Sequence, residues 1–218
     1  MGDGRPRRVA VRALLLALVV LAASACRIRT EVTVDVTDDG SGVVGVAVAL
    51  DADATARVPG LAEELRLDDL LATGWTVTGP ALEADGLTWI RATKPFATPE
   101  EAGRVLAEIN GETGPFRGFA VTRERAFART RFGFAGTIDF TGGLEQFGDQ
   151  ALGDALDGEP LGEDVSAIEA RLGETIDEVF RFRVAVRLPG SVESNAPGDL
   201  ANGASWEPRL SADAPVEL

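Results

Sequence analysis

The chain has 218 residues, a length typical of one domain or at most two small ones. Its 45% hydrophobic and 26% charged side chains are typical of globular proteins. Its 35 acidic residues outnumber its 21 basic residues, and a net charge of −14 disfavours contact with nucleic-acid phosphates, so no nucleic-acid partner is expected. The absence of histidine and the presence of only one cysteine exclude a disulfide framework and any zinc site built from these side chains.

The first 25 residues have the pattern of a secretion signal. Four arginines precede an uninterrupted apolar run at residues 13–23, and the small residues Ser24 and Ala25 follow. This run is too short for a membrane-spanning helix, which needs about 20 apolar residues. We therefore predict a signal peptide at residues 1–25 and an exported domain at residues 26–218. Without the leader, 17 basic and 34 acidic residues remain.

The only cysteine, Cys26, stands directly after this signal. The preceding Ala23, Ser24 and Ala25 resemble the lipobox of bacterial lipoprotein precursors, although the motif usually carries leucine where this chain has Ala23. The motif implies cleavage between Ala25 and Cys26 and a diacylglycerol on the Cys26 sulfur. Because two acyl chains give stable anchoring, we expect a lipid-anchored protein on the extracytoplasmic face of the cell membrane. The alternative is an ordinary signal peptide with an incidental cysteine.

The exported part begins with a predicted β-hairpin. Apolar and polar residues alternate over residues 28–36, turn-forming residues follow at 38–42, and alternation resumes over residues 44–50. Leucines at helical spacing then predict a helix over residues 60–72. Short strands are expected on both sides of the turn at residues 85–86.

The clearest helix start in the chain is at Thr98. Thr98 can cap the helix, proline suits the next position, and Glu101 completes a capping box. We expect this helix to cover residues 98–110. The later predicted elements are strands at residues 116–123, 126–140 and 176–188 and a helix at residues 163–173. Clean alternation in the strands indicates an antiparallel sheet with one covered face. The sequence therefore predicts an α+β domain with a curved, mainly antiparallel sheet and about three helices on one face.

Seven aromatic residues lie on the apolar faces of the predicted strands. They fill a core or, alternatively, line a cavity between the curved sheet and the helices that takes up an acyl chain. Neighbouring glycines allow bends in a sheet and leave part of its surface uncovered. These candidate cavity residues are Trp75, Trp89, Phe119, Phe132, Phe134, Phe180 and Phe182.

Five arginines lie on the opposite faces of two of the predicted strands. They are Arg129, Arg131, Arg181, Arg183 and Arg187. If the two strands pair, these side chains form a positive strip suited to anionic headgroups, since guanidinium groups bind phosphate through paired hydrogen bonds. The alternative is cross-strand ion pairing with Glu31, Asp35 or Asp177, in which each pair contributes little stability.

Residues 184–206 run from a long strand through Leu-Pro-Gly and an asparagine-containing turn to a strand that carries tryptophan. Together with the Cys-Arg-Ile-Arg-Thr start and the capped helix, this ending resembles the LppM-type lipoproteins of high-G+C Gram-positive bacteria over most of residues 26–210. The resemblance implies a non-enzymatic domain reminiscent of hydrophobic-ligand carriers, with envelope lipids or glycolipids as ligands. Such proteins often have a hydrophobic C-terminal helix followed by basic residues. Residues 215–218 show neither, so either the N-terminal lipid is the sole anchor or the protein continues beyond this sequence.

The residues argue against catalysis. A Ser–His–Asp triad needs histidine, the many acidic pairs are expected to be solvated, and phosphate-binding glycine motifs are absent. We therefore expect a non-catalytic, membrane-anchored envelope lipoprotein without cofactor or metal, which binds a lipid, glycolipid or other hydrophobic ligand. The alternative is a structural or protein-interaction module of the envelope.

Overall fold

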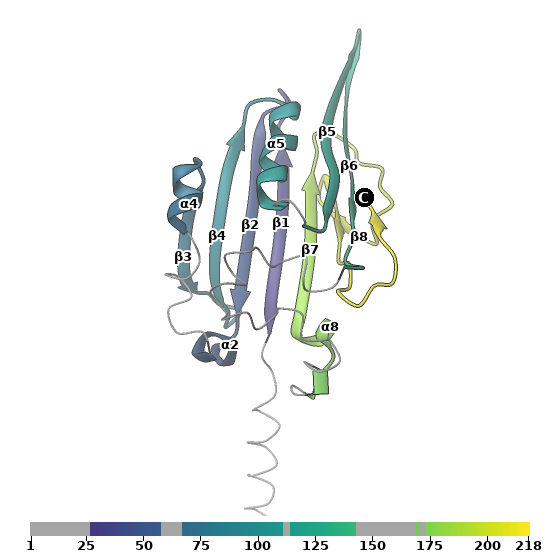
Figure 1. The fold of residues 1–218 in the computed structure, drawn as a ribbon. Coiled ribbons are helices and arrows are strands. Elements are labelled where there is room, and N and C mark those ends of the chain that lie inside the picture. The colour runs from purple at the N-terminus through teal and green to yellow at the C-terminus, as the bar shows by residue number, and fades with distance from the viewer. Residues whose placement is uncertain (1–26, 58–66, 111–113, 143–168, 171–172) are drawn as a thin grey trace, which may run out of the picture.

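The computed structural model describes residues 27–57, 67–110, 114–142, 169–170 and 173–218. In spatial order, the larger sheet contains β3 (Thr76–Leu82), β4 (Thr88–Phe96), β2 (Gly42–Leu50), β1 (Ile28–Val36), β7 (Phe180–Arg187), β9 (Gly203–Trp206) and β8 (Gly198–Leu200). A smaller sheet contains β10 (Val216–Glu217), β6 (Arg129–Ile138) and β5 (Phe116–Ala126) (Figure 1). The domain is thus the α+β type predicted from the sequence, with an open, curved sheet.

Strands β1 and β2 form the predicted hairpin. The valines of β1 are buried and alternate with more exposed polar residues, and the buried Val34 lies opposite the buried Val44 of β2. In the turn, the Asp39 carboxylate accepts hydrogen bonds from Thr37 and Ser41. The hydroxyl of Ser41 makes the largest contribution to lowering the pKa of Asp39, which falls to about 2. Local alternation and turn chemistry account for this element completely.

Strand β7 joins the other side of β1 in parallel, whereas the remaining strand pairs are antiparallel. The register places Phe180 beside Ile28 and Arg187 beside Asp35. The start of β7 therefore lies at the same end of the sheet as the start of β1.

The predicted helix after Thr98 is confirmed as α5 (Pro99–Asn110). The Thr98 hydroxyl accepts a hydrogen bond from the Glu101 backbone N–H at 3.3 Å, and the Glu101 carboxylate accepts one from the Ala97 N–H at 2.7 Å. One face of α5 buries Val105 and Leu106 in the core. The capping residues and the apolar spacing therefore act together, as expected.

Two short helices begin near the start of β1. The sequence did not predict α2 (Ala52–Arg57), whose first turn is capped by the Asp51 carboxylate at 2.8 Å from the Ala54 N–H. The prediction of strand structure from residue 176 is wrong for the first four positions, because Ile176–Val179 form the helix α8. The Glu178 side chain reaches back to the Thr175 backbone N–H at 2.9 Å, and this contact favours a helical turn over an extended start.

The other predicted helices are described only in part. Residues Leu67–Ala72 form α4, the C-terminal half of the helix expected over residues 60–72. The helix expected over residues 163–173 lies outside the described residues except at 169–170, which are helical, and at Gly173, which lies in a turn. No described helix is long and apolar enough to cross a membrane.

The main core lies between one face of the larger sheet and a cover formed by α5 together with the β5–β6 hairpin (Figure 1). Val34 and Val184 from the larger sheet, Val105 from α5 and Ile138 from β6 are almost completely buried. Helices alone were expected to provide this cover. Instead, the smaller sheet provides much of it, because the β5–β6 hairpin pairs with itself and with β10.

Candidate functional site

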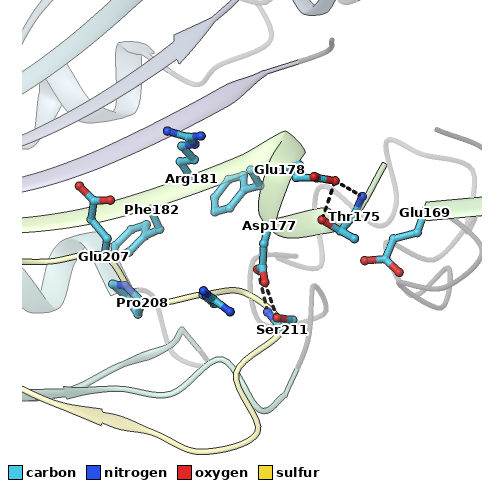
Figure 2. Close-up of a pocket in the computed structure, with 11 residues that line it drawn as sticks. Glu169, Thr175, Asp177, Glu178, Arg181, Phe182, Glu207, Pro208 and Ser211 are labelled. Carbon is cyan, nitrogen blue, oxygen red and sulfur yellow. Dashed lines mark hydrogen bonds between the residues drawn. The ribbon is translucent and has the colours of Figure 1, made fainter. Parts of the chain in front are cut away.

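A cavity of about 660 Å³ lies beside the start of β7 (Figure 2). This volume is within the range of small-molecule sites, roughly 300–1,000 Å³. The described residues that line it come from α8, from β7, from the C-terminal segment after β9 and from positions 169 and 175, which precede α8. They are Glu169, Thr175, Asp177, Glu178, Phe180, Arg181, Phe182, Glu207, Pro208, Arg209 and Ser211.

Polar contacts hold α8 at the edge of this cavity. The Glu178 carboxylate accepts hydrogen bonds from the backbone N–H and the hydroxyl of Thr175, each at 2.9 Å, and the backbone bond is the main reason that the pKa of Glu178 is lowered. The neighbouring Asp177 accepts hydrogen bonds from the backbone and the hydroxyl of Ser211 (Figure 2). Glu169 accepts one from the Ile176 N–H at 2.8 Å. These bonds connect the helix to segments before it and to the C-terminal segment.

Aromatic rings form the apolar side of the cavity. Phe182 is only 3% exposed, and its ring stacks on Phe116 at 5.5 Å and meets Phe140 edge-on at 5.4 Å between ring centroids. Phe180 is half-buried, and Pro208 is buried. The cavity therefore has a firm apolar wall on the side of the core.

Charged groups surround the rest of the cavity, with four carboxylates and two guanidinium groups. Glu207 lies 4.0 Å from Arg183, so each of the four acids has a partner. Arg181 and Arg209 have no ion-pair partner within 4.0 Å among the described residues. Carboxylates accept hydrogen bonds, guanidinium groups donate them, and the two hydroxyls do both. This set matches a ligand with an apolar part and a headgroup rich in hydroxyls better than a bare phosphate.

A smaller cavity of about 230 Å³ lies at the other end of β7. Its lining comes from β6, β7, β9, residues 192–195 and the C-terminus, and includes the apolar residues Phe132, Phe134, Leu188, Trp206 and Leu218. Its volume is below the usual range for small-molecule sites. The larger cavity is therefore the stronger candidate.

Packed aromatic rings separate the two cavities. Centroid distances are 5.5 Å from Phe182 to Phe116, 5.3 Å from Phe116 to Phe119, 5.6 Å from Phe119 to Phe134 and 6.5 Å from Phe134 to Trp206. Phe119 lies over Gly136, where a Cβ atom would be only 2.0 Å from the ring. The missing side chain at this position lets the ring fill the space between the sheets.

The seven predicted aromatic residues are divided among five places. Phe180 and Phe182 line the larger cavity and Phe132 and Phe134 the smaller one, while Phe119 belongs to the packed row between them. Trp75 is buried in the core, where its ring nitrogen donates a hydrogen bond to Glu108 at 3.0 Å. Trp89 belongs to a separate cluster with Ala47, Ala49 and Leu87. The structure therefore does not bring the seven residues to one cavity.

The expected arginine strip does not form, because its two strands do not pair. Arg129 and Arg131 lie on β6, in the smaller sheet, whereas the other three arginines lie on β7, between β1 and β9. The alternative of cross-strand ion pairs is correct for two of them. Arg183 lies 3.2 Å from Glu31, and Arg187 lies 2.9 Å from Asp35. The fifth, Arg181, lines the larger cavity.

Sequence patterns alone did not identify the polar residues of the larger cavity. The Thr-x-x-Glu pattern at Thr175 and Glu178 is a helix-start signal that could have located α8. The contact between Asp177 and Ser211 spans 34 residues and leaves no local signal. Among the described residues, no group of three or more acidic, histidine or cysteine side chains is arranged to hold a metal ion.

Comparison with protein-family models finds no match, and no curated protein matches the chain. Among solved structures, the chain is similar to the folded domain of the Mycobacterium tuberculosis LppM protein, determined by NMR. The TM-score is 0.45 and the sequence identity 13%, over 88% of this chain and 88% of that one. LppM is the type of lipoprotein that the sequence resembles.

Proposed function

We propose that this protein is a non-catalytic cell-envelope lipoprotein, anchored through Cys26, whose domain binds an amphipathic envelope lipid or glycolipid. The observation that carries the proposal is the position of the 660 Å³ cavity at the end of the sheet where β1 begins. Phe180 at its edge pairs with Ile28, two residues after Cys26. A domain held to the bilayer at this point has its cavity facing the lipids that it would take up.

The lining of the cavity supports an amphipathic ligand. Phe180, Phe182 and Pro208 provide apolar contact, and burial of hydrocarbon against such a wall contributes roughly 25 cal/mol per Å². Two arginines without ion-pair partners among the described residues and four carboxylates surround it, so a headgroup finds both donors and acceptors. An acyl chain against the rings with a hydroxylated headgroup among the charged residues satisfies both kinds of surface.

The ligand-binding part is tested with a fluorescent fatty acyl probe and two variants of Phe180. Phe180→Leu keeps an apolar wall and should bind the probe nearly as well as the unmodified protein. Phe180→Glu places a carboxylate against the acyl chain, and because burial of a charge is costly, we expect the affinity to fall at least about tenfold. Urea unfolding checks that both variants fold. Equal binding by the two variants, or none by the unmodified protein, would favour a structural or protein-interaction module instead.

The anchor is tested separately with Cys26→Ser. Without the thiol no thioether to diacylglycerol forms, so the variant should incorporate no radiolabelled palmitate and should leave the membrane fraction. Retention of the label on the Cys26→Ser protein would contradict acylation at this residue.

A further inference from the structure

The β5–β6 hairpin projects beyond the end of the larger sheet (Figure 1). We define its outer part, residues 123–131, as the hairpin tip. The tip contains four arginines and one glutamate, a net charge of +3, in a chain that otherwise has an excess of acidic residues. The net charge of the tip is therefore opposite in sign to that of the whole chain.

An aromatic residue stands at the end of this tip. Phe127 and Ala128 form the turn between the two strands, and Phe127 is 109% exposed, the most exposed of the large hydrophobic residues described. Two-residue hairpin turns favour glycine, asparagine and aspartate. Neither turn chemistry nor packing within the domain therefore accounts for a phenylalanine here.

The arginines point to both faces of the tip. Arg129 and Arg131 are two residues apart on β6 and share one face, whereas Arg125 lies opposite Thr130 on the other face. Arg131 lies 4.0 Å from Glu124, and both side chains are more than two-thirds exposed, so this pair is weak. Arg125 and Arg129 have no ion-pair partner within 4.0 Å among the described residues. Three arginines thus flank Phe127 along the two strands of the tip.

The fourth arginine has a different role, because it holds the base of the tip. The Arg123 guanidinium donates hydrogen bonds to the backbone carbonyls of Asp38, at 3.0 Å, and Asp39 in the β1–β2 turn. Its guanidinium also lies over the Phe132 ring, 5.4 Å from the centroid. These contacts fix the direction in which the tip projects from the domain.

We propose that the hairpin tip docks onto the surface of an anionic phospholipid bilayer, with Phe127 in the interfacial region and Arg125, Arg129 and Arg131 at lipid phosphates. Aromatic side chains suit the membrane interface, and each basic residue near an anionic surface strengthens binding roughly fivefold. A protein partner would need a much larger complementary surface, on the order of 1,000 Å², than one ring on a narrow hairpin offers. Charge complementarity and the shape of the tip therefore favour a bilayer.

This contact lies at the opposite end of the domain from the start of β1 (Figure 1). It needs neither the anchor at Cys26 nor a ligand in the larger cavity, so its test is independent of the proposed function. If both proposals hold, the domain makes membrane contacts at its two ends.

The experiment uses Phe127→Trp in the full chain as a local reporter. The three native tryptophans are buried, so a change in emission reports on the tip. With phosphatidylglycerol vesicles we expect a blue shift and quenching by brominated acyl chains, and with phosphatidylcholine vesicles neither. Adding Arg125→Gln, Arg129→Gln and Arg131→Gln should weaken the response about a hundredfold, and high salt should also weaken it.

Leu71→Trp is the matched control, because Leu71 on α4 is 53% exposed and lies outside the tip. Its emission should not respond to either vesicle. Equal quenching of both reporters would show general adhesion to lipid and would overturn the proposal. An emission of the tip reporter that does not change with anionic vesicles would overturn it too. An emission shift that appears without vesicles and grows with protein concentration would show instead that the tip contacts a second copy of the chain, and would overturn the proposal.

Discussion

The apolar face of strand β7 is covered by packed side chains along its middle and borders a cavity at its start. In the middle, rings such as Phe116 and Phe119 lie 5.3 Å apart, and Ile138 is 1% exposed. At the end beside α8, a cavity of about 660 Å³ lies next to Phe180. The same strand, β7, contributes Phe182 to the packed row and Phe180 to the cavity edge. What differs is the opposite wall, which is made of aromatic residues in the middle and of hydrogen-bonded polar segments at the end.

This comparison shows why one aromatic pattern supports two interpretations. The aromatic residues in the space under β5 and β6 fill a core, whereas those at the start of β7 form the wall of a cavity. Alternation along a strand indicates which side chains point inward, but it does not indicate which groups lie opposite them. The opposite wall is therefore the feature that experiments should probe.

The largest expected effect is in the packed middle, at Ile138. Ile138→Trp adds volume where none is free, and we expect it to destabilise the domain by about 1–3 kcal/mol or more. Ile138→Val, which only removes a methylene group, should cost roughly 0.5–1.5 kcal/mol. Urea unfolding midpoints measure both. If Ile138→Trp left the midpoint unchanged, the space around Ile138 would be as open as the larger cavity, and the comparison would fail.

A smaller effect is expected at the cap of α5, which covers the packed middle. Thr98→Ala removes the acceptor for the Glu101 N–H, and loss of such a cap costs about 1 kcal/mol. Thr98→Ser keeps the hydroxyl and serves as the control. Thermal and urea midpoints that do not change in Thr98→Ala would show that this hydrogen bond contributes nothing to stability.

The elements predicted correctly are those whose signals are local. The β1–β2 hairpin and α5 follow from alternation, turn residues and a capping box within a few positions of each other. The parallel pairing of β1 with β7 joins residues about 150 positions apart, such as Glu31 and Arg183, and no local pattern encodes it. For the same reason, the sequence could not show that the arginines of β6 and β7 belong to different sheets.

The candidate site was predictable only in its aromatic half. Phe180 and Phe182 were identified because they alternate with arginines along one strand. The polar half depends on α8, where apolar alternation through Ile176 concealed the helix start at Thr175. It also depends on the return of the C-terminal segment to place Ser211 against Asp177. Only the folded chain reveals these contacts.

Native mass spectrometry of the protein purified from its own host shows directly whether the larger cavity binds a lipid. We predict a lipid or glycolipid that stays bound under gentle ionisation and dissociates on activation, distinct from the acyl chains proposed at Cys26. The Phe180→Leu protein should retain this ligand, and the Phe180→Glu protein should lose it. A mass equal to that of the polypeptide with the proposed covalent lipid alone, together with no binding of an acyl probe, would show that the cavity holds no lipid.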